Sequence, residues 1–229
     1  MKKLILILVP FTMFLVQSMA AQQAAAPMDR PAEPNLVFDD DGGKVQIVPA
    51  DLAASPQKTF HGGAVLKSAQ QVSIFLGSGW ADEQIATRKL GLADVTASAG
   101  DAPFTEVRSR NVRLLPAAPH VQDFSDLGSR PLNDLDIQRK LSQMLETKAI
   151  PAPNASTVYV VFLAPGTAST LGGNQAGVDY AAYHNFVNLE AGEIHYVVVP
   201  FHPDAQKHTA AATRAFAETA LNPNGRGWF

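Results

Sequence analysis

The sequence contains no cysteine, which excludes disulfide bonds and thiol catalysis. Basic residues are not in excess either, because 18 Lys and Arg stand against 21 Asp and Glu for a formal net charge of −3. Nucleic-acid-binding proteins usually carry a clustered excess of Lys and Arg, so we set that class of partner aside. Beyond the N-terminus no apolar run approaches the roughly 20 residues of a membrane-spanning helix, and no G-x-S-x-G element marks a serine hydrolase. Without disulfide bonds, packing and hydrogen bonding must hold the fold together.

Residues 1–20 have the pattern of a cleavable secretory signal peptide. Two lysines precede the apolar run Leu4–Val16, and small residues lead up to Ala20. This run is shorter than the roughly 20 apolar residues of a spanning helix, although an uncleaved N-terminal anchor is the alternative. We expect cleavage after Ala20 and a secreted or periplasmic protein without a transmembrane segment. Residues 21–43, rich in Ala, Gln and Pro, are predicted to be a flexible leader.

The remaining residues, 44–229, alternate between strand and helix patterns and predict a single α/β domain. Residues 157–163 form a nearly continuous apolar run, typical of a strand covered on both faces. Apolar residues recur along one face of residues 133–148, which predicts a helix. Further strands are predicted at residues 45–48, 71–76, 105–115, 180–186 and 193–199, and further helices at residues 83–92 and 209–221. We expect a mixed, mostly central sheet flanked by helices, with a C-terminal β-hairpin followed by a helix.

Four of the six histidines lie close together in the sequence, at His184, His195, His202 and His208. Imidazole is the commonest transition-metal ligand, but these spacings include no short ligand pair. Two interpretations stay open. Either His184 and His195 are hydrogen-bonded residues of the hairpin while His202 and His208 lie on a solvated loop, or some of the four bind a metal ion. A catalytic triad assembled from distant Ser, His and Asp residues is also left open.

The C-terminal segment T-R-A-F-A-E-T-A-L-N-P at residues 213–223, followed by G-R-G-W at residues 225–228, carries a family resemblance. It resembles the S-H-E-L-A-E-A-x-T-D-P…G-W signature of bacterial relatives of the EXORDIUM, or phosphate-induced, secreted protein family. F-H-G-G at residues 60–63 is similar to the early Y-x-G-G element of that family. Residues 74–80 are similar to its strand-and-glycine segment and residues 183–185 to its Y-H-[SN] element, so the resemblance extends over residues 44–229.

The resemblance implies a helical H-E-x-x-E motif, in which a histidine and a glutamate hold a metal and the intervening glutamate acts as a base. At the matching positions this chain has Arg214, Ala215 and Glu218, with Asn222 in place of an aspartate. Arginine offers no lone pair to a metal and alanine offers no ligand, so we do not expect a divalent site here. Arg214 and Glu218 are instead expected to pair along the helix, either as a structural contact or as a group that faces an anionic ligand.

The leading hypothesis is an exported, non-catalytic EXORDIUM-like protein without a cofactor, with a binding role toward glycan or protein at the cell envelope. Its candidate binding residues are His61, Trp80, Tyr183, His184, Arg214, Glu218 and Asn222.

Two alternatives belong to other classes. One is a zinc-dependent hydrolase of peptides or glycans with a rearranged site, its metal ligands taken from His184, His195, His202 and Glu218. The other is an envelope module that binds glycan or protein through the Gly-rich loop at residues 164–179. Exposed aromatic rings at Trp80, Trp228 and Phe229 would support that module, with ordinary burial of each ring as the competing expectation.

Overall fold

The computed structural model describes residues 45–52, 61–89 and 102–227. All of them belong to one of the two units of the chain, Glu33–Phe229. The predicted signal peptide and leader lie outside the described residues.

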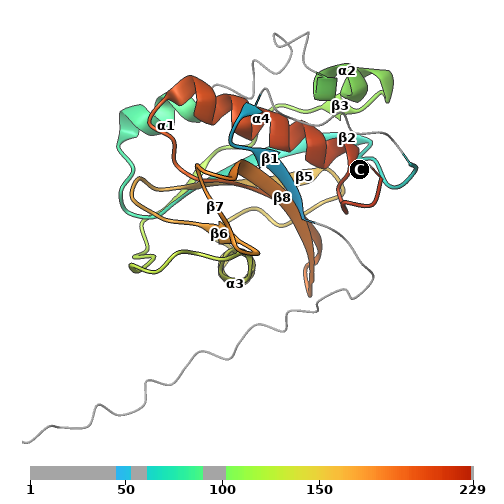
Figure 1. Ribbon diagram of the computed structural model, residues 1–229. Coiled ribbons are helices and arrows are strands. Elements are labelled where there is room, and N and C mark those ends of the chain that lie inside the picture. The colour runs from blue at the N-terminus through green and yellow to red at the C-terminus, as the bar shows by residue number, and fades with distance from the viewer. Residues whose placement is uncertain (1–44, 53–60, 90–101, 228–229) are drawn as a thin grey trace, which may run out of the picture. The chain divides into compact units, whose positions relative to one another are not determined.

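A mixed β-sheet forms the centre of this unit (Figure 1). Its strands follow the order β1 (Gln46–Pro49), β8 (Tyr180–Leu189), β9 (Gly192–Val199), β5 (Thr157–Leu163), β2 (Ser68–Leu76) and β3 (Arg113–Leu114), and β4 (Val121–Asp123) also pairs with β2. Strands β9, β5, β2, β3 and β4 run parallel, whereas β8 is antiparallel to both β9 and β1. The predicted mixed α/β class, with a C-terminal hairpin and helix, is confirmed.

Strand β5 lies in the middle of the sheet, between β9 and β2. All seven of its residues are buried, because layers of side chains cover both faces of the sheet. Its apolar sequence, TVYVVFL, reflects that double burial and begins and ends where the sequence predicted.

Helices cover the two faces of the sheet. Figure 1 shows α1 (Asp82–Lys89), α2 (Ala102–Ser109) and α4 (Ala205–Leu221) on one side, and α3 (Asp134–Glu146) with the small hairpin β6 (Thr170–Leu171) and β7 (Asn174–Gln175) on the other. Each face has its own core cluster: Phe162 and Ala215 belong to the α4 side, and Tyr159 and Leu141 to the α3 side. None of the helices in the described segments is long and apolar enough to cross a bilayer.

The ends of the two longest helices follow from local hydrogen bonding. Helix α3 begins with a capping box between Asn133 and Asp136, and the chain leaves it through Lys148 in the left-handed region, at φ 57°. Helix α4 begins at Ala205, four residues before the predicted start, because the Asp204 side chain accepts hydrogen bonds from the backbone N–H groups of Gln206 and Lys207.

The strand predicted over residues 105–115 is wrong. Helix α2 occupies its first half, and only Arg113–Leu114 forms a strand. Val107 is buried within the helix and Val112 after it, and Asn111 at φ 55° turns the chain between them. A short stretch with so few apolar residues fits both a helical and an alternating pattern, so the sequence does not distinguish them, and tertiary packing stabilises the helix. Helix α1 matches its prediction up to Lys89, and residues 90–92 lie outside the described chain.

Candidate functional site

Two segments that carry the family resemblance pack directly against each other after the end of α4. The backbone N–H of His61 donates to the carbonyl oxygen of Gly227 at 2.8 Å. A Cβ atom on Gly227 would lie 2.5 Å from the carbonyl oxygen of Gly62, so this contact requires glycine. The side chain of Asn222, the C-cap of α4, accepts from the Gly227 N–H at 2.7 Å. Asn222 thus holds a backbone junction, whereas the side chain of His61 is exposed.

The predicted pair of Arg214 and Glu218 is present on α4. Arg214 Nε donates to Glu218 Oε1 at 3.1 Å, and its Nη1 donates to the carbonyl oxygen of Leu52 at 3.0 Å. The guanidinium group therefore joins the helix to the segment that follows β1. Ala215, the neighbour of Arg214 on this helix, is completely buried against the sheet. This geometry favours the structural interpretation of the pair over the ligand-facing one.

His184 and His195 lie in the β8–β9 hairpin, as predicted, and both side chains are buried. They share the α4 side of the sheet, because β-strand residues alternate and their neighbours Ala182 and Val197 belong to the α4-side core. Nε2 of His195 lies 3.2 Å from Glu193 Oε1. Burial lowers the pKa of His195, and the nearby Glu193 carboxylate offsets part of that effect.

The four ligands considered for zinc do not form a metal site. His202 follows β9 just before α4 begins, whereas Glu218 lies in the last turn of the same helix. At 1.5 Å per residue, these two positions are separated by roughly 20 Å along the helix axis. Within residues 45–52, 61–89 and 102–227, no group of three or more His, Asp and Glu side chains is placed to hold a metal ion. The residues present therefore do not fit the proposed zinc ion.

His208 contradicts its prediction as a residue of a solvated loop. It lies in the first turn of α4 with 1% of its surface exposed, because the helix begins earlier than expected. Its Nδ1 accepts a hydrogen bond from Arg88 Nε at 2.9 Å. Burial, followed by the Arg88 charge, lowers the pKa of His208 to about 3, so the ring is neutral near neutral pH. His202, by contrast, is half-buried on a loop, as predicted.

Trp80 belongs to the same cluster and is buried, with 8% of its surface exposed. It packs edge-on against Phe75, with ring centroids 5.1 Å apart. The Arg88 guanidinium lies 5.7 Å from the centre of the Trp80 ring and 5.0 Å from that of Phe201. Trp80 is therefore a core residue rather than an exposed sugar-stacking ring. Trp228 and Phe229 lie outside the described residues.

A polar network on the α3 side of the sheet was not predicted. The carboxylate of Asp134, in the first turn of α3, accepts hydrogen bonds from the Tyr196 hydroxyl at 2.8 and 2.9 Å, from Asn185 Nδ2 at 2.8 Å and from Gln138 Nε2 at 2.8 Å. Gln138 Nε2 also donates to the Tyr196 hydroxyl at 2.9 Å. The network ties α3 to β8 and β9. Two sequence signals pointed to it, the i, i+4 spacing of Asp134 and Gln138 and a polar Asn185 in an apolar strand.

Tyr183, one of the predicted binding residues, lies beside this network and is completely buried. Burial, followed by the negative charge of Asp134, raises the pKa of the Tyr183 hydroxyl well above its ordinary value. The same two causes raise the pKa of Tyr196. Both tyrosines therefore remain protonated and act as neutral groups around the carboxylate. Tyr183 and His184 are adjacent in sequence but face opposite sides of the sheet, so the predicted binding residues do not form one surface.

The Gly-rich segment at residues 164–179 contains the β6–β7 hairpin rather than an irregular loop alone. It is joined to the segment before α3, where the Leu132 N–H donates to the Ala168 carbonyl at 2.9 Å and the Thr170 N–H donates to the Leu132 carbonyl at 2.8 Å. Val178, at its end, is 70% exposed.

The chain was compared with protein-family models, with curated proteins and with solved structures, and none of them matches it.

Proposed function

We propose that this chain is an exported, EXORDIUM-like protein that acts by binding at the cell envelope and has no metal-dependent catalytic centre. The observation that carries the proposal is the pairing of Arg214 with Glu218 where the family motif has two metal ligands. A guanidinium group is always protonated and cannot coordinate a cation.

The surroundings of Glu218 support this reading. Its carboxylate, with 9% of the side chain exposed, lies 3.1 Å from Arg214 Nε. A divalent cation bound to the same carboxylate would have to displace the guanidinium or remain beside it, and the like charges would repel each other. The second support is Ala215, whose buried methyl group stands at the position of the base. In this proposal the protein binds its partner and does not catalyse a reaction on it.

The test is the zinc content of the purified protein after loading with excess zinc and extensive desalting, measured by inductively coupled plasma mass spectrometry. We expect no stoichiometric zinc in the wild-type protein and no chelator-sensitive activity on peptides or glycans. His120→Gln, outside the proposed ligand set, is the control for nonspecific histidine binding. Stoichiometric zinc that is lost in both Glu218→Gln and His184→Gln but retained in His120→Gln would contradict the proposal.

A second candidate, glycan or protein binding through the Gly-rich loop, is favoured by the exposure of two large apolar side chains. Phe124, which follows β4, is 64% exposed, and Val178 in the loop is 70% exposed. The test is retention on purified wall polysaccharide of wild-type protein and of Phe124→Ser/Val178→Ser. This candidate predicts that the double variant folds normally and loses retention, whereas equal retention would exclude this surface.

A further inference from the structure

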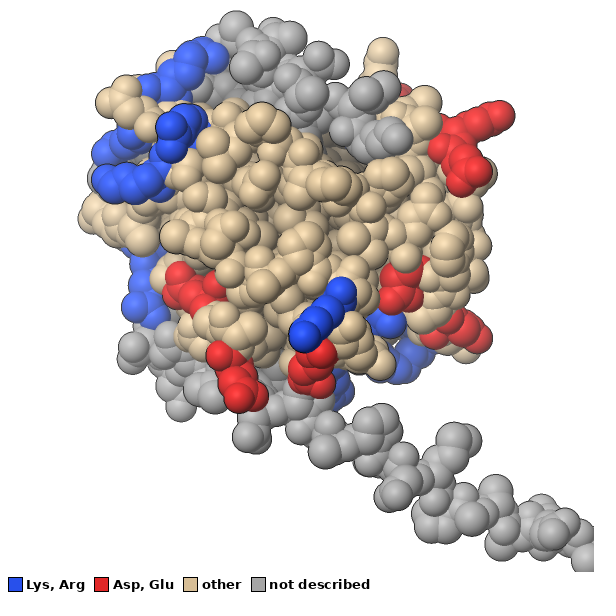
Figure 2. All heavy atoms as spheres, turned by 180° about the vertical axis from the view of Figure 1, so that it is seen from behind, with Lys and Arg blue, Asp and Glu red and all other residues tan. Residues whose placement is uncertain are grey.

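Four exposed basic side chains lie on two neighbouring segments at one side of the sheet. They are Lys67, just before β2, and Arg108, Arg110 and Arg113 in and after α2. Figure 2 shows Lys and Arg side chains gathered at the side of the molecule where α2 and β3 lie, whereas acidic side chains are spread over the lower part of this face and the opposite edge. We call these four residues the basic surface.

Core packing determines that these side chains point outward. Val107 and Val112 are buried, with 3% and 8% of their surface exposed, and anchor the segment to the α4-side core. The basic residues between and beside them are left on the solvent side. The Arg113 N–H donates to the Lys67 carbonyl at 3.1 Å, which brings the two segments together although 46 positions separate them in the sequence.

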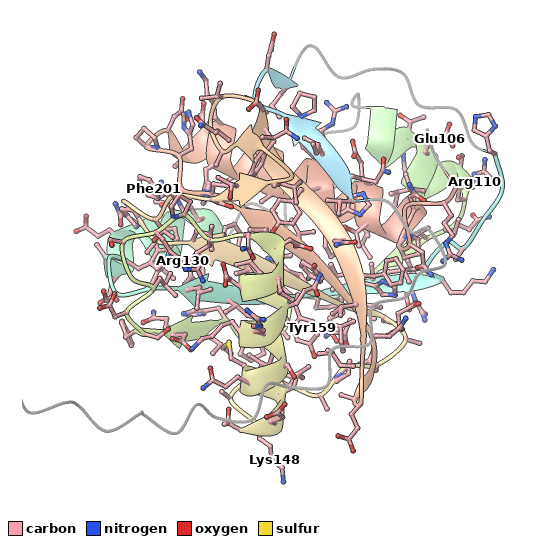
Figure 3. All side chains as sticks on the ribbon, turned by 60° about the horizontal axis from the view of Figure 1, so that its bottom comes forward. Glu106, Arg110, Arg130, Lys148, Tyr159 and Phe201 are labelled. Carbon is pink, nitrogen blue, oxygen red and sulfur yellow. The ribbon has the colours of Figure 1, made fainter. Side chains whose placement is uncertain are left out.

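The basic surface carries a net positive charge in an acidic protein. In residues 61–81 and 105–122 the only acidic residue is Glu106, which lies 3.8 Å from Arg110. Figure 3 labels both residues, Glu106 on α2 and Arg110 immediately after it. The two segments therefore carry three net positive charges, in a chain whose formal net charge is −3. Such a separation of charge favours the binding of an anionic partner at this surface over nonspecific association elsewhere on the protein.

We propose that the basic surface binds the anionic phospholipid face of a membrane, as a peripheral contact. The proposal rests on the envelope location given under the proposed function. Three of the four residues are arginines, whose planar guanidinium groups match phosphate oxygens in pairs. The charges come from a helix, a turn and a strand and spread over a face, an arrangement suited to a plane of separate headgroups rather than to a single linear polymer.

The experiment is co-sedimentation of the purified protein with phosphatidylcholine vesicles that contain either no or about 30% phosphatidylglycerol, at low and high salt. Near an anionic surface each Lys or Arg contributes about fivefold to partitioning. Arg108→Gln/Arg113→Gln should therefore lower partitioning onto anionic vesicles about 25-fold. Lys148→Asn/Lys207→Gln removes two exposed cations elsewhere on the molecule, and asparagine tolerates the positive φ at position 148. This control should change partitioning less than about threefold.

Binding that needs phosphatidylglycerol, falls with salt and is lost only in the basic-surface variant is the expected result. Two results would overturn the proposal: no binding of the wild-type protein to anionic vesicles, whether or not it binds soluble polyanions such as heparin, or equal losses in the two variants. Unfolding curves of both variants verify that each is folded. Vesicle binding and zinc content are independent measurements, so failure of this proposal can be told apart from failure of the proposed function.

Discussion

Replacement of Asp134 by alanine tests the claim that the buried polar network holds α3 on the sheet. The variant leaves three donors, on Tyr196, Asn185 and Gln138, without their carboxylate acceptor. Hydrogen bonds to a charged group contribute about 1.5–3 kcal/mol each. Asp134 is only half-buried, so water replaces part of the loss. We expect the free energy of unfolding to fall by about 2–4 kcal/mol, and the melting temperature by roughly 6–12 °C.

Asp136→Ala is the matched control. It removes another carboxylate from the first turn of the same helix, so both variants lose a similar favourable interaction with the helix dipole. Asp136 pairs with Arg130, whose side chain is 63% exposed, and exposed pairs contribute at most about 1 kcal/mol. Its capping-box contact adds about 1 kcal/mol. We therefore expect Asp136→Ala to cost less than Asp134→Ala.

Urea unfolding followed by circular dichroism measures both variants, provided that the slope with urea is unchanged. A double-mutant cycle between Asp134→Ala and Tyr196→Phe should give a coupling energy of about 1 kcal/mol or more. The reasoning is refuted if Asp134→Ala costs no more than Asp136→Ala, or if the cycle shows no coupling.

Three further predictions concern the backbone junction and two sets of titrating groups. Gly227→Ala should lower the melting temperature by several degrees, because its Cβ atom would lie 2.5 Å from the Gly62 carbonyl oxygen. Gly128→Ala is the control, because nothing lies within 4 Å of a Cβ atom there, although φ at Gly128 is 72° and φ at Gly227 is not in the left-handed region. The pKa of His208 is lowered to about 3, so between about pH 6.5 and pH 3 the unfolded chain binds a proton that the folded chain does not. The stability from neutral His208 is therefore complete above pH 6.5 and is lost as pH falls, by up to about 1.4 kcal/mol per pH unit. Urea unfolding of His208→Asn at a series of pH values should lack this pH-dependent component. All four tyrosines have raised pKa values in the folded protein. Their contribution to the free energy of unfolding is therefore complete below pH 10 and is lost above it, as the tyrosines of the unfolded chain ionise. Tyrosinate absorbance should appear only together with unfolding, and titration of the folded protein near pH 10 would contradict this prediction.

Strong periodic patterns were sufficient to predict much of the fold. The apolar run of β5, the hairpin of β8 and β9, and helix α3 appear where the sequence placed them. These elements are long, and each is buried in the way that its own pattern requires. Helix α2 was missed because it is short and contributes few apolar side chains, so its pattern did not distinguish helix from strand.

The candidate site could be predicted only in part. The Arg214–Glu218 pair followed from their spacing on a helix, since residues four apart lie on one face. The burial of His208 did not, because it depends on where α4 begins and on Arg88, which lies 120 positions away in the sequence. Tyr183 and His184 were grouped as neighbours, but the pleat of β8 directs them to opposite cores.

The sequence by itself determined the α/β class, the central strand, the absence of disulfides and the pairing of Arg214 with Glu218 four residues apart on a helix. These properties depend on composition or on contacts within a few residues. Tertiary structure decided the Asp134 network, the burial of His208 beside Arg88 and the union of Lys67 with Arg113 in one basic surface. Each of these joins segments tens of residues apart, and the register of the sheet and the packing of the helices on it determine which of them meet.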